Sequence, residues 1–297
     1  MTLEQLRIFI AVAEREHVTR AAEALNLTQS AVSAAVAALE TRYGVALFHR
    51  VGRSIELSQE GRAFLGEARA VLERAEAAER ALIDMSGLKR GSLRIRASQT
   101  IASYWLPPRL ASFRRAFPQI DLAVSVGNTQ QAAQAVSSGA AELAFVEGRI
   151  DDPDLELSEV DHDRLIVVVA PGHPWAKKSR LTAKDLAAGE WVLRETGSGT
   201  RSEFEAALTA AGVDPQALNV VLELPSNEAV RVAVEGGAGV GALSDLAAAP
   251  GLETGALARA RFAMSQRTFH ALRHRGRYQS RAAQAFLGHC LGEQETR

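Results

Sequence analysis

The stretch that decides the fold is HVTRAAEALNLTQSAVSAAVAALETRYGVALFHRVGR, which spans residues 17–53. Within it, two apolar patterns at helical spacing lie on either side of a break at Asn26-Leu27-Thr28. Thr19 and Thr28 are of a residue type that caps helix N-termini, so we expect each helix to begin beside one of them. Two short helices across a tight turn form a helix-turn-helix.

The outward face of the second helix indicates what this unit does. If Val32, Val36 and Leu39 point into the core, the residues that point outward are Gln29, Ser30, Ser33, Ala34 and Ala37. A structural helix usually carries charge on that face, whereas these residues are small or amide-bearing. Such a face can approach base edges closely, where an amide bonds adenine and a hydroxyl bonds several bases. An ordinary helical hairpin remains the alternative interpretation for the helix pair taken alone.

A predicted hairpin follows, with strands on either side of a turn at residues 51–54 and its end at Leu57. Arg50 and Arg53 lie next to that turn and at its tip. Arginines at the tip of such a wing can contact phosphates or enter a minor groove. For Arg50, a salt bridge within the domain is the alternative.

Residues 59–86 are predicted to form one long helix with a narrow apolar seam. The seam residues recur at steps of four and three, which is a heptad pattern. They are Phe64, Ala68, Val71, Ala75, Ala78, Leu82 and Met85. A helix this long with one seam is not stable alone in water, so we expect it to pair with its copy in a homodimer or homotetramer. Packing as a core helix on its own domain is the alternative.

Beyond a hinge at 87–91, strands and helices alternate, which predicts an α/β domain with parallel strands. We expect two lobes that are joined near residues 160–163 and 264–267. The predicted organisation is a winged helix-turn-helix domain with an all-α core at 1–58, the dimerisation helix at 59–86 and the hinge. It continues with a first lobe at 92–161 and 267–297 and a second lobe at 162–266.

Composition excludes several classes of protein. The chain has 297 residues, 47% of them hydrophobic and 23% charged, which is ordinary for a soluble globular protein. Its longest apolar run, Leu165–Ala170, is far too short to cross a bilayer, and its N-terminus does not resemble a signal peptide. The single cysteine, Cys290, fits a reducing compartment. We therefore expect a cytoplasmic protein without a membrane partner, in which Cys290 serves packing.

Charge and motifs narrow the function further. The formal net charge is −1, and the first 60 residues hold six arginines and seven glutamates, so this domain lacks the usual basic surplus of DNA-binding proteins. Any DNA affinity must then depend on where the arginines sit and on oligomerisation. The seven histidines do not cluster with other ligands at metal-binding spacing, and no nucleophile elbow or carboxylate pair stands out. We expect no catalytic residue, metal or cofactor.

The first 60 residues resemble the N-terminal domain of LysR-type transcriptional regulators. The residues that carry the resemblance are Leu6, Phe9, Val12-Ala13, Thr19, Ala21-Ala22, Leu25, Thr28 to Ser33, Leu39-Glu40, Gly44, Leu47 to Arg50, Leu57 and Gly61. The layout of the remaining chain agrees, because that family continues with a dimerisation helix and a two-lobed effector domain similar to periplasmic binding proteins. Two positions differ from many members: Ser30 stands in place of proline, and Ala34 in place of a basic or amide residue.

The resemblance implies a double-stranded DNA partner, and it implies that four strand-to-helix junctions face one cleft. On the DNA-binding side the predicted residues are Thr28, Gln29, Ser30, Ser33, Ala34, Arg50 and Arg53. On the effector side they are Ser98, Gln99, Thr100, Asn128, Thr129, Glu147, Thr196, Gly197, Ser198, Gly199, Thr200, Arg201, Ser226 and Asn227. Helix N-termini at such junctions favour anions, with Arg201 as the expected counter-ion. Taken singly, each junction is equally compatible with helix capping, and Thr200 to Glu203 reads as a capping box.

The segments Arg194–Arg201 and Ser98–Ile101 resemble those of regulators that sense small inorganic anions, notably sulfite. Regulators of carbon-fixation genes carry a similar glycine-rich segment and respond to phosphorylated metabolites. We therefore expect a regulator controlled by a small anionic co-inducer, with sulfite or a related sulfur anion as the first choice. The alternatives are a phosphorylated metabolite, a DNA-binding protein without an effector, and a small-molecule carrier or enzyme.

Overall fold

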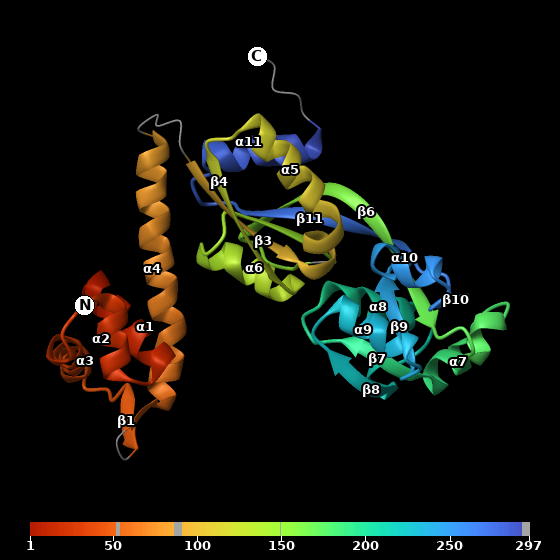
Figure 1. Cartoon of the computed structure of the whole chain (residues 1–297), viewed down its shortest axis with the longest axis horizontal. Coiled ribbons are helices and arrows are strands. Elements are labelled where there is room, and N and C mark those ends of the chain that lie inside the picture. Colours follow the sequence, from red (N-terminus) through yellow and green to blue (C-terminus); the bar gives the residue numbers. More distant parts are fainter. Residues whose placement is uncertain (52–53, 86–90, 149, 293–297) are drawn as a thin grey trace. The chain divides into compact units, whose positions relative to one another are not determined.

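The computed structural model describes residues 1–51, 54–85, 91–148 and 150–292 of the chain. These residues form two compact units, an N-terminal one that extends to Leu82 and a C-terminal one that begins at Ile83 (Figure 1). The predicted hinge lies outside the described residues except for Gly91, which begins the first strand of the second unit. In the described part of the chain, no helix combines the length and the apolar character that a membrane span requires.

The N-terminal unit contains the predicted helix-turn-helix. Its elements are α1 (Leu3–Arg15), α2 (Val18–Leu25), α3 (Gln29–Tyr43), β1 (Phe48–Val51), β2 (Ser54–Leu57) and α4 (Gln59–Met85). Thr28 caps α3 as predicted, because its hydroxyl accepts the backbone N–H of Ala31 at 3.2 Å. The prediction that Thr19 caps α2 is wrong. His17 does so, with Nδ1 accepting the N–H of Arg20 at 3.3 Å, and Thr19 therefore lies inside the helix.

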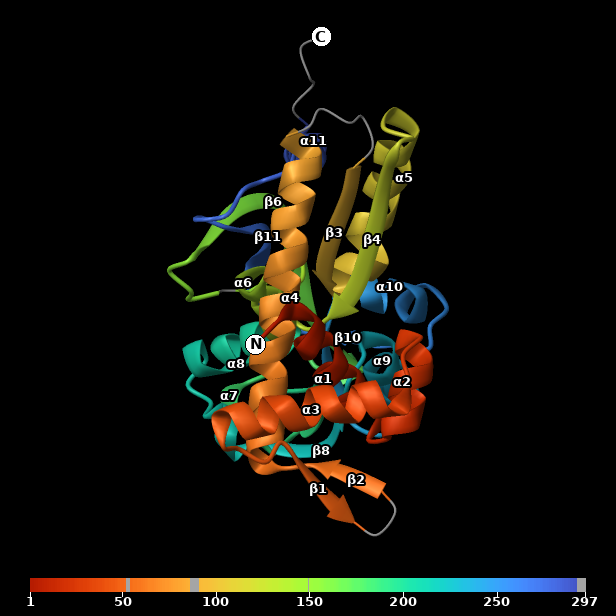
Figure 2. The ribbon, with the colours of Figure 1, turned by 90° about the vertical axis from the view of Figure 1, so that its left-hand side faces the viewer.

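The apolar residues of α3 point inward as expected. Val32 is 0% and Leu39 is 2% exposed, and they pack into two adjoining clusters that also hold Phe9 and Val12 of α1. The wing is an antiparallel hairpin in which Phe48 lies opposite Leu57. Figure 2 shows this hairpin next to α3 and the start of α4.

The apolar seam of α4 is buried near the start of the helix and exposed further along. Its first seam residues belong to the core of their own unit, because Ala68 is fully buried and Phe64 packs in the same cluster as Phe9. Further along, Val71 is 41% and Leu82 is 69% exposed. The alternative interpretation, a core helix, thus holds for the beginning of α4, and the remainder presents an uncovered apolar strip.

The C-terminal unit is built on one nine-stranded sheet, with most strands in the order β4-β3-β5-β11-β6-β9-β7-β8 and with β10 beside β6. The strands are β3 (Gly91–Ser98), β4 (Ile120–Gly127), β5 (Leu143–Glu147), β6 (Leu155–Val169), β7 (Glu190–Arg194), β8 (Asn219–Leu224), β9 (Val240–Ser244), β10 (Ala258–Ala260) and β11 (Gln266–His274). The helices are α5 (Leu106–Ala116), α6 (Thr129–Ser138), α7 (Ala183–Ala188), α8 (Gly199–Ala210), α9 (Asn227–Glu235), α10 (Asp245–Glu253) and α11 (Arg281–Leu291). Shorter helical turns cover Ile101–Trp105, Pro174–Lys177 and Pro215–Ala217.

Two lobes share this sheet. In the first, β3, β4 and β5 are parallel, with α5 and α11 on one face and α6 on the other (Figure 1). In the second, β7, β8 and β9 are parallel, with α8 on one face and α9 on the other. The prediction of parallel strands is wrong for β6 and β11, which pair with each other and with β5 and β9 in antiparallel fashion.

The antiparallel strands connect the lobes. The first part of β6 pairs with β11 as far as Arg164, and from Leu165 onward β6 pairs with β9. β6 therefore changes partners just beyond the predicted junction at 160–163. Cys290 packs in the core of the first lobe, where burial raises the pKa of its thiol to about 12. This agrees with the packing role expected for it, because a buried protonated thiol is inert.

Candidate functional site

The face of α3 that the sequence predicts for DNA is open to solvent. Thr28, Gln29, Ser30 and Ala34 are exposed, and Ser33 is only half-buried. The hydroxyl groups of Thr28 and Ser30 lie 3.1 Å apart and share a hydrogen bond. The buried residues of α3 determine which face of the helix points to solvent, and its small polar residues form one continuous surface on that face.

Arg50 lies on β1 with its side chain exposed, and Arg53 lies outside the described residues. Within the described chain no carboxylate pairs with Arg50, so the salt bridge that was its alternative interpretation is not found there. An exposed guanidinium without a partner is available to a phosphate.

Between the two lobes of the C-terminal unit, a buried carboxylate occupies the position expected for an effector. Glu147 ends β5 and is 1% exposed. Its carboxylate accepts hydrogen bonds from the Ser98 hydroxyl at the end of β3 and, at 3.5 Å, from the Thr200 hydroxyl in the first turn of α8. Three of the predicted effector residues, Ser98, Glu147 and Thr200, thus meet at one point between the lobes. The Glu147 carboxylate occupies that point.

The cation at this point is Arg267. It is 3% exposed, its Nη1 lies 3.7 Å from Glu147 Oε1, and the same atom donates to Thr200 Oγ1 at 3.1 Å. Arg267 also forms a two-pronged ion pair with Asp163, with Nη2 and Oδ2 at 2.6 Å. Burial by itself lowers the pKa of Arg267, but the hydrogen bonds to Asp163 and the charge of Glu147 outweigh it and raise that pKa. The guanidinium is therefore permanently charged.

Asn227 forms a second contact between the lobes. Its amide nitrogen donates to Thr100 Oγ1 at 2.9 Å, and its backbone N–H donates to Gln99 Oε1 at 2.6 Å. On the other side, Arg194 donates to its amide oxygen at 2.7 Å. Ser226 caps α9 through the N–H of Ala229, as the single-junction alternative proposed. Gln99 and Thr100 of one predicted junction are thus brought together with Asn227 of the other.

A third contact joins α6 to the start of α8. The Thr129 hydroxyl donates to the backbone oxygen of Glu147 at 3.0 Å and accepts the N–H of Gly199 at 3.2 Å. A Cβ at position 199 would lie 2.2 Å from that same Glu147 oxygen, so only glycine fits there. Nearby, Gly197 accepts the N–H of Gln130 at 3.2 Å, and Asn128 donates to Glu195 at 3.3 Å.

Two sequence interpretations differ from the arrangement at this junction. Arg201, the predicted counter-ion, does not pair with Glu147 in the structure, because its guanidinium pairs with Glu205 of α8 and Glu223 of β8. Thr200 to Glu203 is not a capping box, since α8 begins at Gly199 and its N-cap, the buried Ser198, makes no side-chain cap bond. Thr196 is exposed and has no side-chain bond to this set among the described residues.

Sequence reasoning missed Arg267, Asp163 and Ser244, whose hydroxyl donates to Asp163 at 2.6 Å. A signal was present, because the two predicted lobe junctions carry opposite charges at residues 163 and 267 beside apolar strands. Together, Glu147, Asp163 and Arg267 carry a net charge of −1. This charge disfavours a further anion at the same point while the Glu147 carboxylate occupies it.

A groove of about 610 Å³ lies beside these contacts. Thr129, Gly197 and Ser202 line one part of it, and Asp151 and Asp152 line another. The groove is an open space next to the contacts between the lobes. Asp151 and Asp152 make part of its wall acidic. The arrangement as a whole offers hydroxyl, amide and guanidinium donors, which suits reversible binding of a small polar molecule.

Comparisons with known proteins agree with this geometry. The family description "Bacterial regulatory helix-turn-helix protein, lysR family" matches residues 3–62, and "LysR substrate binding domain" matches residues 86–295. YeiE of Escherichia coli strain K12, described as an uncharacterized HTH-type transcriptional regulator, is 35% identical over 98% of this chain and 97% of its own.

Two solved structures have the same fold. Full-length CbnR complexed with its target DNA matches with a TM-score of 0.73 at 22% identity, covering 99% of this chain and 100% of that one. The regulatory domain of CcmR from Synechocystis PCC6803 in complex with 2-PG matches with a TM-score of 0.63 at 26% identity, covering 70% of this chain and 99% of that one. With a DNA-binding helix-turn-helix unit and a two-lobed small-molecule effector domain, this chain belongs to the LysR family of bacterial transcriptional regulators.

Proposed function

We propose that this regulator is controlled by a small oxyanion, with sulfite as the first candidate, which takes the place of the Glu147 carboxylate between the lobes. The observation that carries the proposal is the setting of that carboxylate: Glu147 is buried against the Ser98 and Thr200 hydroxyls, with Arg267 at 3.7 Å. Hydrogen-bond donors and a fixed guanidinium around a carboxylate are equally suited to an inorganic oxyanion of similar size.

In this proposal Glu147 is an internal occupant of the site. When the effector binds, the carboxylate turns toward the adjoining groove, and the hydroxyl groups exchange one anionic partner for another. Contacts between the lobes, including Asn227 with Thr100 and Gly199 with Thr129, change with that exchange. The effector then favours one arrangement of the lobes by the difference in its affinity for the two states.

The direct test is a thermal unfolding series on the full chain under anaerobic conditions with sulfite, sulfate, phosphate and 2-PG. A specific ligand at 100 times its dissociation constant stabilises the protein by about 2.7 kcal/mol. We expect sulfite to raise the unfolding temperature and to alter operator affinity, and we expect Thr200→Val to lose both effects. If all four anions leave the unfolding temperature unchanged, the protein binds DNA without this kind of effector.

Replacing Glu147 with glutamine is expected to tighten sulfite binding by roughly tenfold, because it removes the negative charge that competes for the same donors. Arg267 keeps Asp163 as its partner, so the fold should be retained. The measurement is isothermal titration calorimetry. Glu159→Gln, at an exposed glutamate on β6, is the matched control and should leave the affinity unchanged. Weaker binding in the Glu147 variant would mean that this carboxylate does not compete with the effector.

A phosphorylated metabolite is the second candidate. It is supported by the 2-PG complex of the related CcmR domain and by the 610 Å³ groove beside Glu147, which has room for more than an inorganic anion. Asp151 and Asp152 oppose it, because they would face the extra negative charge. The same ligand series separates the candidates, since a response to 2-PG without a response to sulfite selects the metabolite.

We further propose that the regulator binds DNA as a homo-oligomer held by α4, with the α3 face in the major groove and the wing on the backbone. Each dimer would then read two half-sites roughly 34 Å apart. The uncovered strip with Val71 and Leu82 supports pairing through α4, and the exposed Gln29 supports base contact by α3.

Replacing Gln29 with alanine is expected to weaken specific operator binding by about 1–3 kcal/mol per subunit, the usual value of an amide contact to adenine. Non-specific DNA binding should change little, because phosphate contacts do not involve this amide. Fluorescence anisotropy with operator and scrambled duplexes at fixed salt measures both. Gln59→Ala, at an exposed glutamine that begins α4, is the control. Unchanged discrimination between the duplexes would remove Gln29 from base reading.

A further inference from the structure

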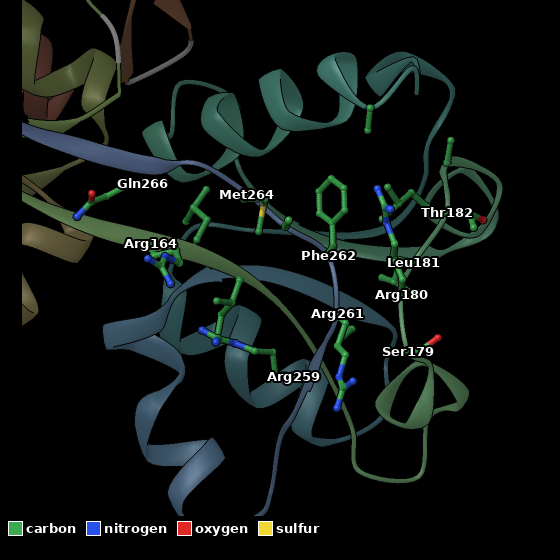
Figure 3. Close-up of a pocket in the computed structure, with 17 residues that line it drawn as sticks. Arg164, Ser179, Arg180, Leu181, Thr182, Arg259, Arg261, Phe262, Met264 and Gln266 are labelled. Atoms are coloured by element: carbon green, nitrogen blue, oxygen red, sulfur yellow. The ribbon is translucent and has the colours of Figure 1, made fainter.

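One contact between the lobes lies apart from Glu147 and from the donors around it. The Tyr104 hydroxyl of the first lobe donates to Glu228 Oε1 in the first turn of α9 at 3.1 Å, and both side chains are half-buried. Neither residue lines the groove of about 610 Å³. Neither lines the cavity of about 850 Å³ that lies over β6 and β10 in the second lobe (Figure 3). The contact therefore belongs to neither of these two spaces.

Tyr104 lies in an irregular helical turn. Residues Ile101–Trp105 form a π-helical turn, in which the N–H that follows the turn bonds an oxygen five residues earlier. Pro107 and Pro108 come next, at the start of α5, and they have no N–H with which to continue a regular α-helical ladder back into this turn. Such turns are rare and are frequently found at functional positions.

The same turn contacts a strand that connects the lobes. The indole N–H of Trp105 donates to Asp161 of β6 at 2.7 Å, and Arg109 pairs with that carboxylate at 3.1 Å. Asp161 lies opposite Phe269 of β11, next to the point where the register of the two strands shifts. Burial raises the pKa of Asp161, but the hydrogen bonds from the His162 backbone and from Trp105 outweigh it and lower that pKa. The turn is thus fixed to the connecting strand by a charged carboxylate.

The chemistry of the Tyr104 contact fixes which group is the donor. Burial and the negative charge of Glu228 raise the pKa of Tyr104 to about 12, so the phenol keeps its proton. Among the described residues, no other side chain bonds the Glu228 carboxylate, and nearby Arg231 is paired with Glu235. A hydrogen bond to a charged acceptor is stronger than one between neutral groups. Tyr104 and Glu228 therefore form one strong contact that breaks as a unit.

We propose that Tyr104 is a latch between the lobes, whose bond to Glu228 holds them in the described arrangement and breaks when they separate. Trp105 keeps the turn on the connecting strand, so the Tyr104 hydroxyl stays in place while the second lobe moves. Tyr104 is a positioning residue, because it does not contact Glu147. The latch sets the balance between two lobe arrangements before any effector binds. The proposal rests on the proposed function only for the statement that the lobes change their arrangement.

Two backbone N–H groups report directly on separation of the lobes. Asn227 and Gly199 are the first residues of α9 and α8, so their N–H groups have no partner within the helix. Both are bonded across the cleft instead, Asn227 to Gln99 Oε1 at 2.6 Å and Gly199 to Thr129 Oγ1 at 3.2 Å. Hydrogen exchange at these two positions therefore measures how often the lobes part at two separate places.

The test is hydrogen exchange of the full chain without any effector, read by mass spectrometry with fragmentation to single residues. We expect Tyr104→Phe to speed exchange of both N–H groups by roughly tenfold, the loss expected for a hydrogen bond to a charged group. Exchange in β5, a buried strand within the first lobe, should change less, because the variant does not unfold that lobe. Glu228→Gln keeps an oxygen that accepts the same bond and should show a smaller effect than Tyr104→Phe.

Tyr43→Phe is the matched control. It removes the same hydroxyl from a tyrosine at the end of α3 that is 54% exposed and forms no hydrogen bond through that hydroxyl among the described residues. It should leave both exchange rates unchanged. The double variant Tyr104→Phe/Glu228→Ala should exchange no faster than Glu228→Ala alone, because both changes remove one contact.

The proposal is overturned if Tyr104→Phe leaves both rates unchanged, or if the effects of the two substitutions add in the double variant. It is also overturned if only Asn227 responds, because the contact then acts locally and does not hold the lobes together. These outcomes are measured without an effector, so they do not depend on whether sulfite binds, and either proposal can fail while the other stands.

Discussion

Replacing both Val71 and Leu82 with glutamate is expected to convert the regulator into monomers and to weaken operator binding by roughly 100-fold or more, because two half-sites are then no longer bound together. Both side chains are exposed in the single chain, at 41% and 69%, so they are free to pack against a second copy. Four glutamates in a paired seam would repel one another across an apolar contact. Analytical ultracentrifugation and operator titration measure the two effects.

Gly66→Glu is the matched control for this variant. Gly66 is exposed on α4, and a Cβ there would meet no other atom within 4 Å, so a negative charge is added to the helix without a contact. Glutamate is a good helix former, and the circular dichroism of all variants should therefore remain helical. An unchanged sedimentation coefficient in the double variant would place the oligomer contact elsewhere in the molecule.

Replacing Arg267 with methionine is expected to lower the free energy of unfolding by about 3–5 kcal/mol, the cost of leaving a buried charge without its partner. The guanidinium lies between Asp163 and Glu147, both of which are almost fully buried. For a domain of this size the melting temperature should fall by roughly 10 °C. Chemical denaturation, followed by circular dichroism, measures the loss.

The comparison is Arg273→Met, since Arg273 pairs with Glu156 at a site where both side chains are about one-third exposed. Such a surface pair contributes at most about 1 kcal/mol. A second comparison, Arg267→Met combined with Asp163→Leu, should recover part of the stability, because one unpaired carboxylate is removed. Equal losses for Arg267→Met and Arg273→Met would show that the interlobe ion pair adds little to the fold.

Local patterns were enough to predict most of the fold. Helix caps such as Thr28, the apolar faces of α1 and α3, and the pairing of β1 with β2 all depend on residues close together in the sequence. Buried strands inside a lobe, such as β5 and β9, were predictable for the same reason, because a short apolar run marks a buried strand, whereas the three-residue β10 was missed. The first part of β6, residues 155–164, was missed because it is largely polar and partly exposed.

The candidate site was only half predictable. Ser98, Thr200 and Asn227 were found because each lies at a strand-to-helix junction. Arg267 was missed because its partner Asp163 is 104 residues away, and no local rule pairs two such residues. Arg201 was chosen instead because it stands next to the glycine-rich turn. The two neighbouring residues of α8 point in different directions. The Arg201 side chain points along α8 toward Glu205, while the Thr200 side chain points between the lobes toward Glu147.

The buried carboxylate of Glu147 has a consequence for how the regulator responds to concentration. If the effector has to displace a group that is tethered to the protein, its apparent dissociation constant equals the intrinsic one divided by the fraction of time for which the site is vacant. The tethered group therefore sets a threshold below which the regulator does not respond. A substitution at this one residue would move that threshold without altering either the DNA-binding surface or the donors that recognise the effector.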